Sequence, residues 1–276
     1  MRKATVPPSR AVPLCGRSLR KIILDQSKRA HTGHIGSSLS IADIIAVLYG
    51  SVLNISAPDD ADLDRFVLSK GHAALALYAA FHLKGWLQEG QLDTFCGVNT
   101  LLGVHPEHQL PGVDFSSGSL GMGLGYAAGA ALAARMQGSS RRAFAVLSDA
   151  ECNEGSVWES AMFAAHHRLA NLTAVIDLNG QQALGYTPEV LNLDRMAERW
   201  DTFGWDVHTV DGHDEALLQK TFEQLDYRTG RPHVIIARTT FGKGVSFMEG
   251  KIKWHYWPMD GAEYAQAIRE VEGVIQ

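Results

Sequence analysis

Two polar residues follow two apolar segments at positions that a parallel sheet would bring together. Asp149 follows the segment 143–147, and Asn179 follows the segment 172–176. If both segments are strands of one parallel sheet, the two side chains meet in the crevice at its carboxyl edge, where open α/β folds bind ligands. A buried carboxylate needs a partner, so Asp149 binds a metal ion or a cationic or hydrogen-bonding group. The metal interpretation also explains Asn179, because Mg²⁺ prefers oxygen ligands and shares them with phosphates.

Four histidines fall in expected loops and turns, and together they suggest a pocket lined with imidazoles. They are His34, His72, His105 and His255. His31 with His34, and His105 with His108, have a three-residue spacing. In a loop this spacing is weak evidence for zinc, because only a helix forces both rings onto one face. His166 and His167 fall on an expected helix and are interpreted as structural.

Alternating apolar segments predict an α/β fold with a parallel sheet that helices cover on both faces. The expected strands are 64–69, 143–147, 172–176, 206–210 and 232–238, and the expected helices are 17–30, 40–50, 73–83, 127–136, 156–169, 196–203 and 214–225. The segment 31–38 between the first two helices is interpreted as a glycine-broken loop. Residues 1–16, which hold three prolines, are expected to form an arm, and residues 17–276 one domain.

Composition excludes several classes of protein. The net charge is −5 and the basic residues are scattered, which gives no electrostatic footprint for nucleic acid. The three cysteines, Cys15, Cys96 and Cys152, lie far apart, so neither a disulfide framework nor a thiolate zinc site is indicated and a reducing cytoplasm fits best. No apolar run reaches the length of a membrane span.

A glycine-rich segment, 121–129, superficially resembles a dinucleotide-binding fingerprint. A true fingerprint opens from a long buried strand and has an acidic residue about 20 positions later. The residues before this segment include only the short 113–115 run, and Arg141 and Arg142 lie downstream. Close helix packing or a tight turn explains these glycines at least as well as nicotinamide or flavin binding does.

Several segments occur in the order and near the spacing found in transketolases. They are 32–36, 64–73, 103–107, 118–121 and 148–155, followed by Asn179. On these motifs, residues 17–260 resemble the first, diphosphate-binding domain of a thiamine diphosphate dependent transketolase. Several independent motifs in one order make this resemblance specific.

The resemblance implies a role for each matching residue. Asp149, Asn179 and the backbone carbonyl of Gln181 would coordinate a divalent ion, Mg²⁺ or else Ca²⁺ or Mn²⁺. His34 and His105 would face the reactive carbon and the substrate hydroxyls. The implied cofactor contacts are His72, Gly118, Leu120, Ala150, Glu151, Asn179 and His255, of which His72 and His255 would bind the diphosphate.

Two departures from the family pattern bear on binding. The family's metal motif usually reads Gly-Asp-Gly, and this chain has Ser148-Asp149-Ala150. If the backbone of Ala150 needs a positive φ, the added methyl group costs roughly 1 kcal/mol or more. Ile35 stands where many relatives have proline, which should alter loop stiffness more than chemistry.

The resemblance also implies a missing half. Full-length transketolases continue into a pyrimidine-binding domain whose glutamate activates the cofactor, and this chain stops at Gln276. We therefore expect a split, cytoplasmic transferase: this chain with a separately encoded C-terminal subunit, most simply as an α2β2 heterotetramer, would move a ketol unit from a ketose to an aldehyde. Glu154 and Glu159 match acidic residues near the family's subunit interface. The alternatives are a deoxyxylulose phosphate synthase or 2-oxoacid dehydrogenase type subunit, or a degenerate regulatory subunit.

Overall fold

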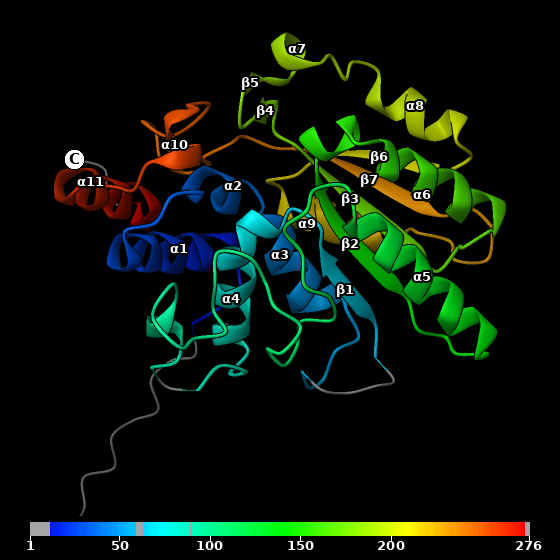
Figure 1. Cartoon of the computed structure of the whole chain (residues 1–276), viewed down its shortest axis with the longest axis horizontal. Coiled ribbons are helices and arrows are strands. Elements are labelled where there is room, and N and C mark those ends of the chain that lie inside the picture. The colour runs from blue at the N-terminus through cyan, green and yellow to red at the C-terminus, as the bar shows by residue number, and fades with distance from the viewer. Residues whose placement is uncertain (1–11, 59–62, 89, 274–276) are drawn as a thin grey trace, which may run out of the picture.

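The computed structural model describes residues 12–58, 63–88 and 90–273, and within them a five-stranded parallel sheet forms the centre (Figure 1). The strands are β1 (Arg65–Leu68), β2 (Ala143–Ser148), β3 (Leu172–Leu178), β6 (Asp206–Asp211) and β7 (His233–Arg238). Their order across the sheet is β1-β2-β3-β7-β6. Most of the expected arm, residues 1–11, and the last residues, 274–276, lie outside the described residues.

Helices cover both faces of the sheet, as the sequence predicted, and each face has its own apolar core. One core lies under α5 (Gly123–Met136), α6 (Gly155–His166) and α8 (Met196–Thr202), and the other lies under α1 (Gly16–Ala30), α3 (Ala42–Val47), α4 (Ala74–Leu83) and α9 (Glu215–Glu223). Every residue of β2 is buried. A strand covered on both faces is almost continuously apolar, and this is why its sequence pattern predicts it.

The structure corrects the expectation for the segment between residues 31 and 50. The expected loop is in part a helix, α2 (Ile35–Ser40), and the expected helix 40–50 is divided into α3 and one π-helical turn, Leu48–Val52. Ile41, with φ −97° and ψ 4°, separates α2 from α3. Glycine and serine have poor helix propensity and concealed α2, whose residues are all buried. Tertiary packing therefore overrides local propensity here.

Further short elements were not predicted from the sequence. They are the hairpin β4 (Gln181–Gln182) and β5 (Gly185–Tyr186), the helices α7 (Thr187–Val190), α10 (Lys253–Tyr256) and α11 (Gly261–Glu272), and the 3-10 turns Gly71–Ala73, Leu92–Thr94 and Ala150–Asn153. The helix α11 packs against α1 (Figure 1). Its start carries a capping box of Asp260 and Glu263. No helix among the described residues is long and apolar enough to cross a membrane, and all three cysteines are free.

The register of the sheet brings the predicted metal ligands to one edge. Ser148 of β2 pairs with Asp177 of β3, and the backbone N–H of Asp149 donates to the carbonyl of Asp177 at 3.1 Å. Because all five strands are parallel, the residues that follow β1, β2 and β3 share the carboxyl edge. The expected juxtaposition of the two strand ends is confirmed.

Candidate cofactor site

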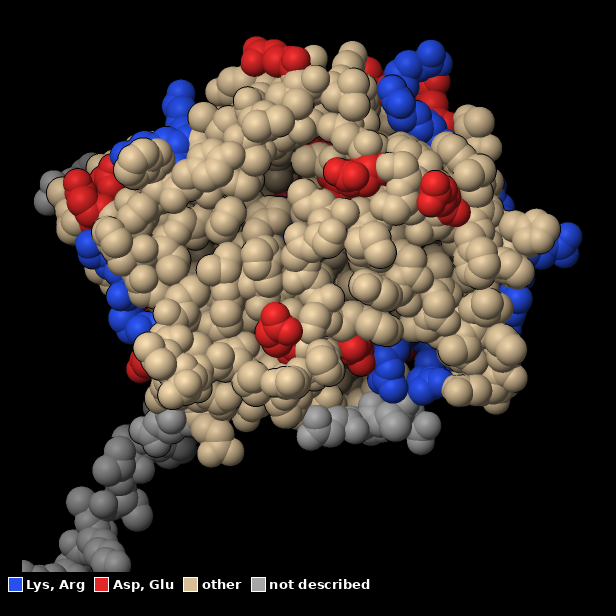
Figure 2. All heavy atoms as spheres, in the orientation of Figure 1, with Lys and Arg blue, Asp and Glu red and all other residues tan. Residues whose placement is uncertain are grey.

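A cavity of about 210 Å³ opens at the carboxyl edge of the sheet. It collects most of the predicted site residues, namely His34, His72, His105, Gly118, Leu120, Ala150, Asn179, Gln181 and His255. These residues come from segments between residues 34 and 255, so only the fold brings them together. The space-filling view shows a hollow in this face, with charged residues placed mostly around the margin (Figure 2).

Three imidazoles form the centre of this cavity. The ring centroids of His34 and His72 are 5.5 Å apart, those of His34 and His255 are 5.1 Å apart, and those of His72 and His255 are 5.5 Å apart. His105, an exposed residue that also lines the cavity, packs its ring beside Gly118, where an added Cβ would lie 3.2 Å from the ring. Glycine at 118 therefore leaves room for that imidazole.

Burial keeps the central histidines neutral. It lowers the pKa of His34, with a smaller contribution from His105, and it lowers the pKa of His72 well below the ordinary value, assisted by the charge of Lys70. Burial, then the proximity of His34 and Lys70, lowers the pKa of His255 to about 4. Neutral imidazoles offer both a donor and an acceptor. An anionic ligand would reverse part of these shifts, because a nearby negative charge favours the protonated ring.

Several buried polar atoms of the cavity have no hydrogen-bond partner among the described residues. They are Nδ1 of His34, Nδ1 of His255, both side-chain polar atoms of Gln181 and Nε2 of Gln182. Buried polar atoms are almost always paired in folded proteins, and each unpaired one costs free energy. Their concentration around one cavity indicates that a polar ligand completes them.

The backbone at His34 is held in an uncommon conformation. Its φ is +58° and its ψ is 20°, in the left-handed region that non-glycine residues rarely adopt. The N–H of His34 donates to the carbonyl of His255 at 3.1 Å. An added Cβ at Gly33 would lie 2.4 Å from the carbonyl oxygen of Tyr256, so the two segments approach each other closely. Strain of this type is typical of functional sites that the surrounding structure fixes.

An ion pair that the sequence analysis missed supports the cavity from below. Lys70 and Asp177 pair with fully buried side chains, and Lys70 also lines the cavity. Asp177 accepts further hydrogen bonds from Ser40 at 2.7 Å, from Thr239, and from the amide of Asn179 at 2.8 Å. Burial alone would raise the pKa of Asp177, but Lys70 and the hydroxyl donors hold it below its ordinary value. Asp177 therefore positions both Lys70 and Asn179.

Asp149 lies beside the cavity and does not line it. Its Oδ2 accepts from the N–H of Gly180 at 2.7 Å and from Thr187 at 3.3 Å, and its Oδ1 accepts from the N–H of Ala150 at 2.8 Å. Burial and then the charge of Asp177 raise its pKa to about 7. The carboxylate thus reaches the turn after Asn179 and makes no ion pair of its own among the described residues. A carboxylate has about four lone-pair positions, so these three donors leave one for a metal ion.

The oxygen donors around this turn fit a hard divalent ion. Oδ1 of Asn179 accepts from the N–H of Gln181 at 2.9 Å, which fixes the amide next to the Gln181 backbone. A carboxylate, an amide oxygen and a backbone carbonyl form an all-oxygen donor set, which suits Mg²⁺ better than a softer metal. The chemistry of these residues is therefore compatible with the ion that the resemblance implied.

Glu151 needs a correction, because the structure places it outside the cavity. Its two carboxylate oxygens accept from Ser69, from the N–H of Gly121 at 2.9 Å and from the N–H of Ser148 at 2.9 Å. The side chain is completely buried. Glu151 therefore fastens three segments that border the cavity, and its oxygens do not face a ligand.

Ala150 tolerates its departure from the family motif. It begins the 3-10 helix Ala150–Asn153 and is not among the residues with positive φ. The strain that a left-handed alanine would carry is therefore absent. Its half-buried methyl group lines the cavity and changes only the shape of the wall.

Glu154 and Glu159 lie on the outside of the molecule at α6. Glu154 precedes the helix and packs beside Gly121, where an added Cβ would lie 2.6 Å from the glutamate Cβ. Neither carboxylate makes an ion pair within the part of the chain that the structure describes. Both charges thus remain available to a partner.

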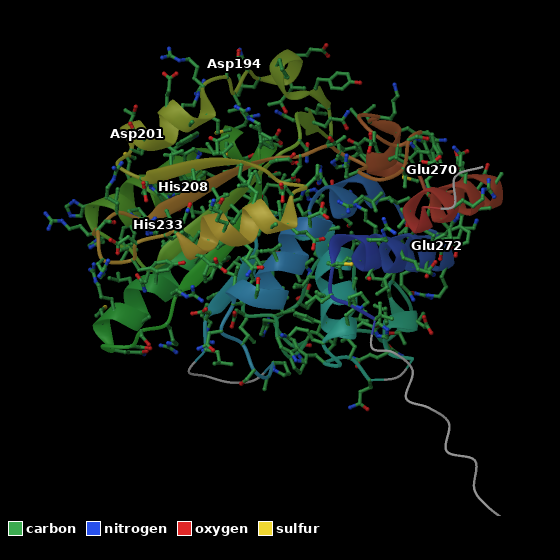
Figure 3. The ribbon with its side chains drawn as sticks, turned by 180° about the vertical axis from the view of Figure 1, so that it is seen from behind. Asp194, Asp201, His208, His233, Glu270 and Glu272 are labelled. Atoms are coloured by element: carbon green, nitrogen blue, oxygen red, sulfur yellow. The ribbon has the colours of Figure 1, made fainter. Side chains whose placement is uncertain are left out.

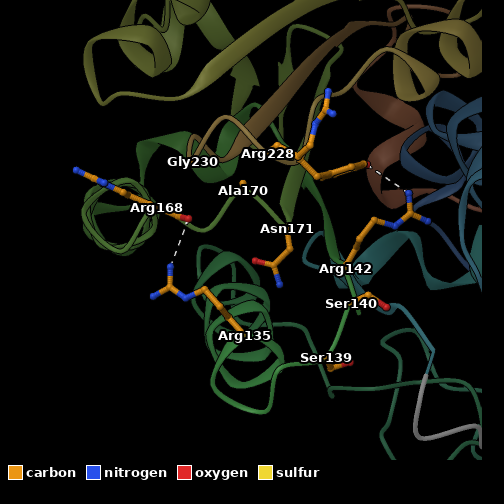
Figure 4. A pocket seen from close by; sticks show the side chains of 10 residues that line it. Arg135, Ser139, Ser140, Arg142, Arg168, Ala170, Asn171, Arg228 and Gly230 are labelled. Atoms are coloured by element: carbon orange, nitrogen blue, oxygen red, sulfur yellow. Dashed lines mark hydrogen bonds between the residues drawn. The ribbon is translucent and has the colours of Figure 1, made fainter.

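A second hollow, of about 460 Å³, lies at the opposite, amino edge of the sheet (Figure 4). Its arginines are largely committed to the protein itself: Arg142 pairs with Asp64, and Arg135 donates to the carbonyl of His167. No carboxylate or imidazole of the described residues lines this hollow. Although it is larger, it lacks the uncommitted acid–base groups of the cavity at the carboxyl edge.

Comparison with known proteins agrees with this geometry. Residues 14–274 match the family described as transketolase, thiamine diphosphate binding domain. The chain is 38% identical over 259 residues to the first of the named subunits of apulose-4-phosphate transketolase from Phocaeicola vulgatus, covering 93% of this chain and 92% of that protein. It is also 38% identical over 257 residues to the 6-deoxy-6-sulfo-D-fructose transketolase subunit SqwG of Clostridium sp., covering 92% and 94%.

The fold matches solved transketolases as well. The structure of transketolase from Campylobacter jejuni aligns with a TM-score of 0.87 and 29% identity, over 93% of this chain and 42% of that one. The chain therefore belongs to the transketolase family, a family of transferases, through its thiamine diphosphate binding domain. Thiamine diphosphate is the cofactor of this domain, and a divalent cation accompanies it in the family.

Proposed function

We propose that this chain is the diphosphate-binding subunit of a two-component transketolase, and that a separately encoded subunit supplies the pyrimidine half of the site. Two relatives that are named as transketolase subunits match it over more than 90% of their own lengths. The Campylobacter enzyme is matched over only 42% of its chain. A cofactor that binds between two domains then needs the second polypeptide.

The observation that carries the proposal is the cavity of neutral imidazoles and unpaired polar atoms next to Asp149. We assign the divalent ion to Asp149, Asn179 and the backbone carbonyl of Gln181. His72 and His255 are assigned to the diphosphate oxygens, where each imidazole can donate one hydrogen bond. The buried cation of Lys70 adds positive potential on the same side.

The remaining two histidines are assigned to the substrate. His34 and His105 line the same cavity from different segments, and as imidazoles they can hold or pass a proton at a substrate hydroxyl. Thiamine diphosphate, when bound, supplies the electron sink that carbon–carbon cleavage beside a carbonyl requires. We propose a ketose as donor and an aldehyde as acceptor, because the two relatives are named for ketoses that carry a phosphate or a sulfonate.

The partner is expected to dock where apolar side chains surround the mouth of the cavity. Leu120, Met122 and Tyr126 are 36%, 45% and 41% exposed, and Met162 and Phe163 of the adjacent α6 are also exposed. Exposed apolar residues that gather beside a polar cavity are typical of an interface. Glu154 and Glu159 flank this surface on α6, so they can pair with cations of the partner. An α2β2 assembly in the cytoplasm is the simplest arrangement.

The proposal is tested by reconstitution. The chain is purified by itself and together with the pyrimidine-domain protein encoded beside it, and ketol transfer to an aldehyde is measured with thiamine diphosphate and Mg²⁺. Activity is expected only from the pair. Appreciable transfer by the isolated chain would refute the split site.

A regulatory subunit without a site of its own is not favoured by the structure. That alternative rested on the replacement at Ala150, which causes no backbone strain. The two ideas differ in a simple measurement: Mg²⁺ with thiamine diphosphate should raise the melting temperature of the reconstituted pair, by the binding free energy that the native state gains. An unchanged melting temperature would favour the regulatory role.

A further inference from the structure

Three side chains of types that bind metals meet at the amino edge of the sheet, away from the cofactor cavity. Asp206 begins β6, His208 follows two residues later, and His233 begins β7. Asp206 and His233 are register partners across the two parallel strands. Because side chains alternate along a strand, Asp206 and His208 project from the same face as their neighbour His233. His208 and His233 lie close together at this edge (Figure 3).

The distances suit one small ion. Oδ2 of Asp206 lies 3.2 Å from Nε2 of His208 and 3.1 Å from Nδ1 of His233, and the three ligand atoms all lie within 4.8 Å of one another. Bonds of about 2.0–2.1 Å in a tetrahedral zinc site place neighbouring ligand atoms about 3.3 Å apart. Only a small adjustment of the side chains would therefore admit such an ion.

The surroundings of His233 also favour a cation. Its side chain is fully buried, and its Nε2 has no hydrogen-bond partner among the described residues. The ring of Tyr227 packs against this imidazole at 5.3 Å with an interplanar angle of 81°. An aromatic ring accepts an N–H weakly and donates nothing, which favours the proton on Nε2. In that tautomer Nδ1 and the carboxylate of Asp206 are two acceptors that face each other, and a cation between them removes the conflict.

We propose that Asp206, His208 and His233 form a zinc site with an open fourth position for water. The side chains of Asp206 and His208 are 36% and 28% exposed, so an ion reaches the site from solvent. Two nitrogens and one oxygen suit Zn²⁺ and not Mg²⁺, which prefers oxygen ligands alone. The ion would fasten the edge strand β6 to β7 and would be independent of the cofactor's metal.

Equilibrium dialysis of the full chain against Zn²⁺, in excess Mg²⁺, tests the site. The matched variants are His208→Ala, which removes a ligand, and Thr209→Ala, which alters the next residue of β6 on the opposite face. We expect one bound zinc equivalent in the parent and in Thr209→Ala, and an affinity at least about 100-fold weaker in His208→Ala. Equal zinc binding by His208→Ala and the parent would overturn the proposal, as would a parent that binds no zinc.

A second measurement separates this site from the cofactor histidines, which also bind metals in principle. Co²⁺ in a site of four ligands gives visible absorption that reports the ligand set, so the spectrum is recorded for the parent, Asp206→Asn and His72→Ala. The proposal requires the spectrum to persist in His72→Ala and to change in Asp206→Asn. The reverse pattern would assign the ion to the cofactor cavity and contradict the proposal.

Discussion

The two edges of the same sheet differ in how their polar groups are satisfied. At the carboxyl edge, buried atoms of His34, His255 and Gln181 have no hydrogen-bond partner among the described residues. At the amino edge, Arg142 pairs with Asp64, and the amide of Asn171 donates to two backbone carbonyls. The hollow at the amino edge is nevertheless the larger, at about 460 Å³ against about 210 Å³. Uncommitted polar groups, and not the size of a hollow, therefore distinguish the cofactor site.

The largest effect is expected from the buried ion pair under the cavity. Lys70→Ala leaves the fully buried carboxylate of Asp177 without its cation, and such a change costs about 3–5 kcal/mol of the free energy of unfolding. Urea denaturation measures the loss. Lys21→Ala is the matched control, because Lys21 pairs with Asp25 at the surface and should contribute about 1 kcal/mol or less. Similar values for the two variants would contradict the role of Lys70.

The paired amino edge should affect stability alone. Arg142→Ala removes an ion pair with the buried Asp64 and the stacking of the guanidinium over Phe144, at 4.9 Å from the ring. We expect a loss of about 1–3 kcal/mol in the free energy of unfolding. Calorimetry on the reconstituted pair should show an unchanged dissociation constant for thiamine diphosphate. Weakened cofactor binding without a loss of stability would remove the distinction between the two edges.

Acid should destabilise the chain through the cavity histidines. Burial holds the pKa of His255 at about 4, whereas an unfolded histidine titrates near pH 6.5. As pH falls below about 6.5, the unfolded state takes up the proton first, so the free energy of unfolding decreases until the pH passes about 4. Allowing for solvent screening, we expect roughly 1–3 kcal/mol from this residue. His255→Asn should flatten the pH profile between these limits, and an unaltered slope would show that other groups cause it.

The smallest effect concerns the departure at Ala150. Because its φ is not positive, Ala150→Gly relieves no strain and only adds freedom to the unfolded chain, which costs about 0.4–1 kcal/mol. The dissociation constant for thiamine diphosphate should change less than about threefold, a free-energy difference below about 1 kcal/mol. Isothermal calorimetry on the reconstituted pair measures it. A tenfold gain in affinity would mean that the methyl group obstructs the diphosphate.

The framework of the fold was predictable because both faces of the sheet are covered. The segments of β2 and β3 are mostly apolar, so their strands and the meeting of Asp149 with the turn at Asn179 followed from the sequence. The pair of Lys70 and Asp177 was missed, although a lone aspartate within the apolar segment of β3 was a visible signal. Its partner could not be identified, because the pairing depends on how β1 and β3 lie relative to each other.

Other features depend on orientation, which spacing does not determine. Glu151 is two residues from Asp149, yet the 3-10 turn directs it toward Ser69 and away from the cavity. The capping box of Asp260 and Glu263 was present in the sequence and could have revealed α11. The meeting of His208 with His233 could not have been found, since it requires the register of β6 on β7.

The central claim is that the oxygens at Asp149 and at the turn after β3 hold the divalent ion of the cofactor. Its most direct test is the calorimetric affinity of the reconstituted pair for thiamine diphosphate with Mg²⁺, comparing Asp149→Asn with Asp211→Asn, an aspartate that ends the neighbouring strand β6 at the same edge. The account predicts a loss of at least about 100-fold, roughly 2.7 kcal/mol, for Asp149→Asn and none for Asp211→Asn. Equal, Mg²⁺-dependent affinity in both variants would contradict it.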